Sequence, residues 1–155
     1  MSYLRATRVL GWLLGIAVLV SVVHYVDNYV NYDDYPVPAS DSSLPVPSAG
    51  LVAFGWFLFT AFGAVGLLLW FRRHITSAAI ALTGYSLSGL IGIAHYTIPG
   101  ATDMVWWRQT HVIVDIICGV AVLAFALWAA RNSSELIPPG SQPVRQKTPG
   151  TQRAS

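Results

Sequence analysis

The sequence predicts an all-α membrane protein, a bundle of four helices that each cross a lipid bilayer. Its 155 residues are 54% hydrophobic and only 10% charged, and the mean hydropathy is +0.54. A soluble domain carries about 25% charged residues, so this chain has too little charge to cover a water-facing surface. The chain also contains four apolar stretches of the length, roughly 20 residues, that a helix needs to cross the hydrocarbon core.

The first predicted helix covers residues 9–28, and Arg5 and Arg8 precede it. Basic residues before an apolar run are also typical of a signal peptide. Here, however, the apolar run leads directly into His24, Tyr25 and Asp27, and no cleavage site of two small residues separated by one position follows it. We therefore expect a helix that is retained in the mature protein.

The second and third predicted helices cover residues 50–71 and 75–97. The link between them is very short, so the two helices must form an antiparallel hairpin. By contrast, the Asn31–Gly50 link is long and contains several prolines, which favour extended backbone. The fourth predicted helix covers residues 110–130 and completes a domain at 1–131. Residues 132–155 are rich in Pro, Ser, Gln and Arg, a composition typical of a disordered tail.

The positions of the basic residues predict the orientation in the membrane. Eight of the nine basic residues lie on one side of the predicted topology, and only Arg108 lies on the other. By the positive-inside rule, the basic side is cytoplasmic. We therefore expect a multi-pass protein of a bacterial plasma membrane with both termini in the cytoplasm. The basic residues on the inner side are Arg5, Arg8, Arg72, Arg73, Arg131, Arg145, Lys147 and Arg153.

Three of the four histidines fall at the same depth, near the outer ends of their helices. His24 lies near the end of the first helix, His95 near the end of the third, and His111 near the start of the fourth. The remaining histidine, His74, lies in the cytoplasmic turn. Ionisable residues in membrane spans are costly and usually mark a functional site, so we predict a polar site at the outer end of the bundle.

Two aspartates accompany these histidines at helical spacing. Asp27 shares a helix face with His24, and Asp115 lies four residues after His111. Asp115 falls inside an apolar span, where a carboxylate costs about 3 kcal/mol, so it must face the interior and find a partner. We expect the imidazole of His111 to donate to it. Asp115 and Asp27 are the predicted catalytic residues.

Three neutral imidazoles are a sufficient set of ligands for zinc, copper or iron. His24, His95 and His111 are therefore the predicted metal ligands, with a divalent transition metal as the expected cofactor. Such a metal would activate a bound water for attack on a lipid or another amphiphile in the outer leaflet. No HExxH or CxxC pattern supports this prediction. In the alternative interpretation, the same side chains form a polar cap and satisfy one another.

Other functions remain open at the level of sequence. Two of the histidines could ligate a b-type haem in an electron-transfer subunit. The small size and glycine-containing helices also fit an accessory or assembly subunit of a larger membrane complex, or a homo-oligomer. Proton-coupled transport is a further alternative, although four helices are few for it. The net charge of +2 gives no indication of a nucleic-acid partner, and the single cysteine, Cys118, excludes an internal disulfide.

Overall fold

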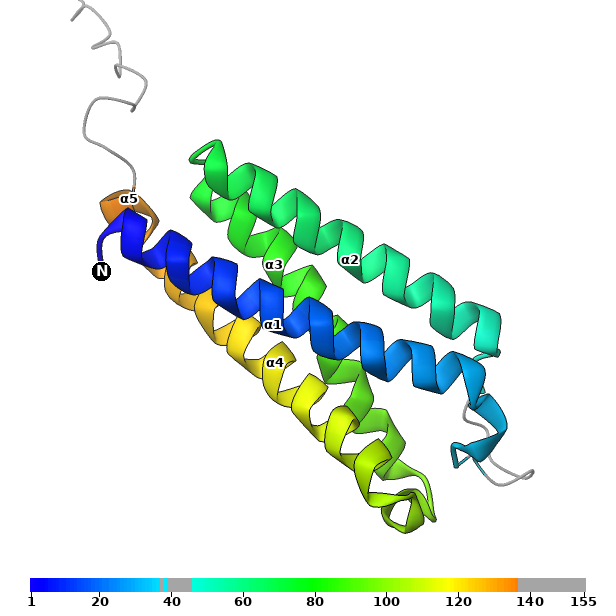
Figure 1. Ribbon diagram of the computed structural model, residues 1–155. Helices are drawn as coiled ribbons and strands as arrows, with labels where there is room; N and C mark the ends of the chain where they lie inside the picture. The colour runs from blue at the N-terminus through cyan, green and yellow to red at the C-terminus, as the bar shows by residue number, and fades with distance from the viewer. Residues whose placement is uncertain (37, 39–45, 137–155) are drawn as a thin grey trace, which may run out of the picture.

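The computed structural model describes residues 1–36, 38 and 46–136, and its four long apolar helices pack as a bundle. Figure 1 shows the N-terminus, the α2–α3 turn and the short helix α5 at one end, which we call the basic end. The C-terminal end of α1 and the start of α4 lie at the opposite end, called the acidic end. The elements, in order, are α1 (Tyr3–Val30), η1 (Tyr32–Asp34), α2 (Ala49–Phe71), α3 (Ile75–Leu90), η2 (Ile91–Thr97), η3 (Ala101–Asp103), α4 (Trp106–Arg131) and α5 (Ser133–Leu136).

Helix α1 is longer than predicted because it begins at Tyr3 and not near residue 9. The hydroxyl of Ser2 caps its first turn by accepting a hydrogen bond from the backbone N–H of Arg5. Its 28 residues correspond to a length of about 42 Å. The helix can therefore cross a hydrocarbon core of about 30 Å and still extend beyond it at both ends.

The turn between α2 and α3 forms the predicted tight hairpin. Helix α2 ends at Phe71, and Arg73 adopts a left-handed conformation with φ of 63°. The N–H of His74 then donates to the carbonyl of Leu69. This single left-handed residue reverses the chain within three residues, which explains why the two helices lie side by side in Figure 1.

The predicted third helix changes its geometry before it ends. The α-helix stops at Leu90, and residues 91–97 continue as the 3₁₀ helix η2. A 3₁₀ helix has 3.0 residues per turn and not 3.6, so the change alters the direction in which His95 points. Residues 75–97 are still long and apolar enough to count as one candidate membrane span.

The chain after α4 also differs from the expected tail. Residues 133–136 form the short helix α5, and Leu136 is only 2% exposed, packed against the core. The guanidinium of Arg73 donates to the carbonyl of Leu136. The bundle therefore extends to residue 136, and the remainder of the predicted tail, 137–155, lies outside the described residues.

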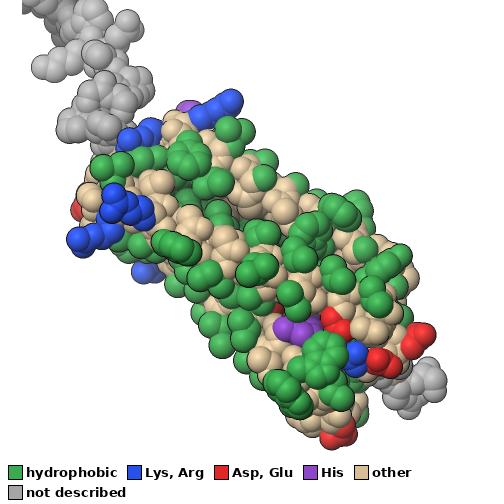
Figure 2. Space-filling model, in the orientation of Figure 1, with side chains coloured by type: hydrophobic (Ala, Val, Ile, Leu, Met, Phe, Trp, Pro, Cys, Tyr) green, Lys and Arg blue, Asp and Glu red, His purple; other side chains and the backbone are tan. Residues whose placement is uncertain are grey.

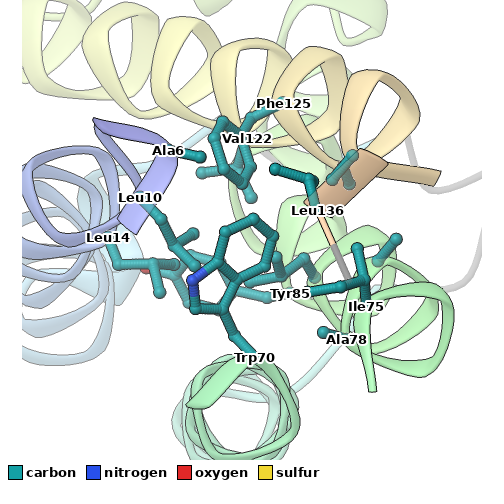
Figure 3. Close-up of a cluster of buried hydrophobic side chains, with 14 of the residues drawn as sticks. Ala6, Leu10, Leu14, Trp70, Ile75, Ala78, Tyr85, Val122, Phe125 and Leu136 are labelled. Atoms are coloured by element: carbon teal, nitrogen blue, oxygen red, sulfur yellow. The ribbon is translucent and has the colours of Figure 1, made fainter. Parts of the chain in front are cut away.

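A hydrophobic core fills the bundle at the basic end, and Figure 3 shows its side chains meeting between the helices. Trp70 is fully buried at its centre. The Trp70 indole N–H donates to the hydroxyl of Thr7, and its ring stacks on Tyr3 with 5.5 Å between the ring centroids. The polar atom of this large side chain is therefore satisfied inside the core, as a buried tryptophan requires.

Helices α3 and α4 approach each other most closely at two glycines. A Cβ on Gly89 would lie 2.1 Å from the carbonyl oxygen of Asp115, and a Cβ on Gly119 would lie 2.8 Å from that of Ser86. Because the obstructing atoms belong to the backbone, neither position can accept a side chain without moving the helices. The two glycines thus determine how closely α3 lies against the part of α4 that carries Asp115.

The described helices have the length and hydropathy of a four-span membrane protein. Four spans meet both criteria, Tyr3–Val30, Ala49–Phe71, Ile75–Thr97 and Trp106–Arg131. Figure 2 shows hydrophobic side chains over the middle of the visible face, with basic side chains gathered at one end and acidic side chains at the other. This distribution matches a bundle whose middle faces lipid and whose two ends face water.

Candidate functional site

Three of the four histidines come together inside the acidic end of the bundle. His24 comes from α1, His95 from η2 and His111 from α4. The ring of His24 lies at the centre, with its centroid 5.8 Å from that of His95 and 5.5 Å from that of His111. Their common depth left open whether the three histidines meet, and the structure brings their rings together.

Asp115 pairs with a different histidine from the one expected. Asp115 is only 2% exposed. Its carboxylate lies 2.7 Å from Nδ1 of His24 on the neighbouring helix. His111, one turn along the same helix, instead points Nε2 toward Asp27 at 3.2 Å. The expected contact within α4 is thus replaced by two contacts between α1 and α4, because these two helices pack side by side.

The carboxylate of Asp27 has four hydrogen-bond partners. It lies 3.2 Å from Nε2 of His111 and accepts from the guanidinium of Arg108 at 3.0 Å. It also accepts from the hydroxyl of Tyr35 and the amide of Asn31, both at 2.6 Å. An ionised carboxylate offers about four acceptor sites. Three of the contacts are to Oδ2, and the one from Asn31 is to Oδ1. Since so many groups hold one carboxylate, the geometry favours a positioning role for Asp27 over a role as a base.

Arg108 is the site residue that the sequence interpretation missed. Its side chain is buried, with the residue 6% exposed, and it bridges Asp27 to Asp34 at 3.0 and 3.1 Å. The available signal was its position as the lone basic residue on the acidic side. Tyr35 packs beside it, and burial together with the bond to Asp27 raises the pKa of the Tyr35 phenol.

His95 is held by a third polar contact. Nε2 of His95 lies 3.3 Å from the amide nitrogen of Asn28. Since an amide NH₂ can only donate, Nε2 must accept, and the proton of the neutral ring then resides on Nδ1. The Asp115 carboxylate can only accept, so Nδ1 of His24 donates to it, and in the neutral ring Nε2 of His24 carries the lone pair.

Among residues 1–36, 38 and 46–136, no group of three or more His, Cys, Asp or Glu side chains is arranged to hold a metal ion. Each of the three histidines directs one nitrogen to Asp115, Asp27 or Asn28. Within the same described ranges, Nδ1 of His111 is buried without a hydrogen-bond partner.

The spacing of the His24 and His111 rings does not support the haem interpretation. Two axial imidazoles must lie on opposite faces of a porphyrin. The His24 and His111 rings instead lie directly beside each other, tilted by 39°. This arrangement does not support His24 and His111 as the two axial ligands of one haem.

A cavity of about 560 Å³ adjoins the histidines. His24 and Asn28 from α1 and His95 from η2 contribute polar atoms to its wall, whereas the side chains from α2, such as Leu51 and Phe54, are apolar. A cavity volume of 300–1,000 Å³ is typical of small-molecule sites. The site therefore combines a hydrophobic chamber with two imidazoles.

Comparison of the chain with protein-family models, with curated proteins and with solved structures found no match. By its fold and the geometry of the site, this protein is a small multi-pass membrane protein with a buried polar cluster at one end of its bundle.

Proposed function

We propose that this protein binds and acts on a lipid or another amphiphile at the outer surface of a bacterial plasma membrane. Its termini lie in the cytoplasm in this proposal, since the basic residues gather at the end of the bundle where α1 begins and α4 ends. The histidines and Asp115 then lie at the depth of the outer leaflet, where the head of an amphiphile would reach them.

One observation carries the proposal: the apolar cavity meets a buried histidine–aspartate pair. His24 lines the cavity, and the carboxylate of Asp115, which is not among the lining residues, lies 2.7 Å from Nδ1 of His24. A carboxylate in this position orients an imidazole and stabilises it when it gains a proton. Nε2 of His24 can then accept a proton from a bound hydroxyl or water, which is the task of a general base.

The other site residues receive supporting roles in this proposal. Asp115 positions His24, while Asp27 positions His111 and Arg108. A buried carboxylate that pairs with a guanidinium is more useful for fixing geometry than for taking protons, because the nearby positive charge stabilises its ionised form. His95 offers a second polar group to the head of the bound molecule.

The test uses purified protein in liposomes made from a total bacterial lipid extract. Mass spectrometry of the bound and free lipids compares wild type with Asp115→Asn, which has nearly the same shape but no charge to orient His24. Asp103→Asn is the control, because it removes an exposed acid from the same end of the bundle. Unfolding temperatures verify that both variants fold.

We expect one class of amphiphile to be retained or converted by wild type and by Asp103→Asn, but not by Asp115→Asn. If lipid profiles with all three proteins match those of protein-free liposomes, the proposed function is wrong. If Asp115→Asn behaves as wild type does, an amphiphile binds but the histidine–aspartate pair has no part in the activity.

Metal binding by His24, His95 and His111 is a second candidate function, favoured by one specific observation. Nδ1 of His111 is buried without a partner in the described part of the chain, and carboxylates already hold the other nitrogen of His111 and one nitrogen of His24. Carboxylates commonly orient metal-bound histidines in this way. The buried guanidinium of Arg108 opposes this function, because it would repel a divalent cation.

Elemental mass spectrometry of untagged protein separates the two candidates. A bound metal predicts near-stoichiometric zinc, copper or iron that is lost in His111→Ala and kept in His74→Ala, which changes the histidine of the basic-end turn. If no metal is found, even after incubation with each of the three ions, the metal candidate is wrong and the amphiphile site stands without it.

A further inference from the structure

The described part of the wall of the cavity beside the histidines carries no formal charge. None of the described residues that line it is Lys, Arg, Asp or Glu. The charged residues of the site lie behind the wall, where Asp115 is bound to His24 and Arg108 is bound to Asp27 and Asp34. A phosphate or carboxylate head in this cavity would lose its hydration and gain no cation in return, which is strongly unfavourable.

The two imidazoles of the wall offer one acceptor and one donor. The hydroxyls in the same wall already donate within the protein, those of Tyr25, Tyr32, Tyr35 and Thr97. Nε2 of His24 is an acceptor because Asp115 accepts the Nδ1 proton, and Nδ1–H of His95 is a donor because Asn28 donates to Nε2. The two ring centroids are 5.8 Å apart. In this arrangement one oxygen between the rings would make a hydrogen bond of about 2.8 Å to each.

A hydroxyl group meets both requirements with a single oxygen atom. It donates its proton to one ring and accepts from the other, and it carries no charge. An ether or ester oxygen can only accept, so it would leave the acceptor of His24 without a partner. The apolar side chains from α2, including Leu51, Phe54 and Leu58, provide the complementary surface for a hydrocarbon chain.

We infer that the cavity binds a neutral amphiphile with a hydroxyl head, such as a long-chain alcohol, and that His24 and His95 hold the hydroxyl group. This inference rests on the proposed function, since it names the class of molecule that the same site would take. The chain lies toward α2 and the head toward α1 and η2.

The experiment measures the binding of three probes that share one chain and differ only in the head. Full-length protein in phosphatidylcholine nanodiscs is titrated with oleyl alcohol, oleyl methyl ether and oleyl phosphate, and bound probe is quantified by mass spectrometry. We expect saturable binding of oleyl alcohol. The loss of one hydrogen bond should weaken the methyl ether about tenfold, and the phosphate should bind more weakly still.

Two glycine variants test the position of the chain. Gly55 lines the cavity, and a Cβ there would meet only the ring of Phe59 at 3.9 Å, so Gly55→Leu fills the cavity without disturbing the backbone. Gly15→Leu is the matched control, because nothing lies within 4 Å of a Cβ on that exposed residue of α1. Oleyl alcohol should bind about tenfold more weakly to Gly55→Leu and normally to Gly15→Leu.

Each contrary result has a distinct meaning. Binding of oleyl phosphate as tight as that of oleyl alcohol would overturn the neutral head but leave an amphiphile site in place. Equal binding of the alcohol to both glycine variants would overturn the assignment of this cavity. If oleyl alcohol does not bind while the lipid extract yields another ligand, the hydroxyl inference fails and the proposed function survives.

Discussion

Replacement of Gly89 by alanine should disturb the bundle and the polar site together. The added Cβ would lie 2.1 Å from the carbonyl oxygen of Asp115 and 3.1 Å from the backbone nitrogen of Gly119. Ordinary contact begins at 3.4 Å, so the two helices must separate by about 1.3 Å at this point. The residue that moves is Asp115 itself, whose carboxylate holds His24.

The cost of this separation follows from the kind of atom that obstructs the methyl group. Overpacking of an interior typically costs about 1–3 kcal/mol, and the upper part of this range applies when backbone and not a flexible side chain must move. A loss of about 3 kcal/mol lowers the unfolding temperature of a chain of this size by roughly 6–12 °C.

Thermal unfolding in detergent, followed by tryptophan fluorescence, measures the effect. Gly11→Ala is the control, because nothing lies within 4 Å of a Cβ on Gly11 and alanine is the better helix former. We expect Gly11→Ala to unfold at or slightly above the wild-type temperature. For a chain of this size, about 1 kcal/mol corresponds to 2–4 °C. If Gly89→Ala unfolds within 2 °C of Gly11→Ala, the close packing of α3 on α4 is refuted.

Two further predictions concern the acidic end. Arg108→Leu leaves the buried carboxylate of Asp27 without its cation and should lower the free energy of unfolding by about 3–5 kcal/mol. Denaturant titration measures this loss, and a value under about 1 kcal/mol would contradict the prediction. Burial raises the pKa of Tyr35 above its value in the unfolded chain. The contribution of the neutral Tyr35 phenol to stability is therefore complete below about pH 10 and is lost as the pH rises further. Folded wild type and Tyr35→Phe should therefore show equal phenolate absorbance at about pH 11. Extra phenolate in wild type would contradict the raised pKa of Tyr35.

The helices could be predicted from sequence because their cause is local. A run of about 20 apolar residues must be helical in a bilayer, since only a helix satisfies all its backbone groups within the segment. The structure confirms four such helices by length and hydropathy. Their ends were less predictable, as the early start at Tyr3 and the short helix Ser133–Leu136 show, because capping and tertiary burial decide them.

The close contact between α3 and α4 was only partly visible in the sequence. Small residues at helical spacing on α3 do indicate that another backbone can approach. The positions that make the closest approach are Gly89 and Gly119, whereas Gly84 faces the ring of Phe62 on α2. Composition reveals that a helix has a smooth face, but the neighbour that uses each glycine depends on how the helices rotate about their axes.

The sequence by itself determined the depth of each polar residue, because depth in a helical bundle follows from counting residues along an apolar span at 1.5 Å each. It therefore placed His24, His95 and His111 at one end. Only the tertiary structure decided the pairing of Asp115 with His24 and of Asp27 with Arg108. These contacts join residues about 80 or more positions apart, and they depend on which helices are neighbours and which faces they turn toward each other, choices that long-range packing makes.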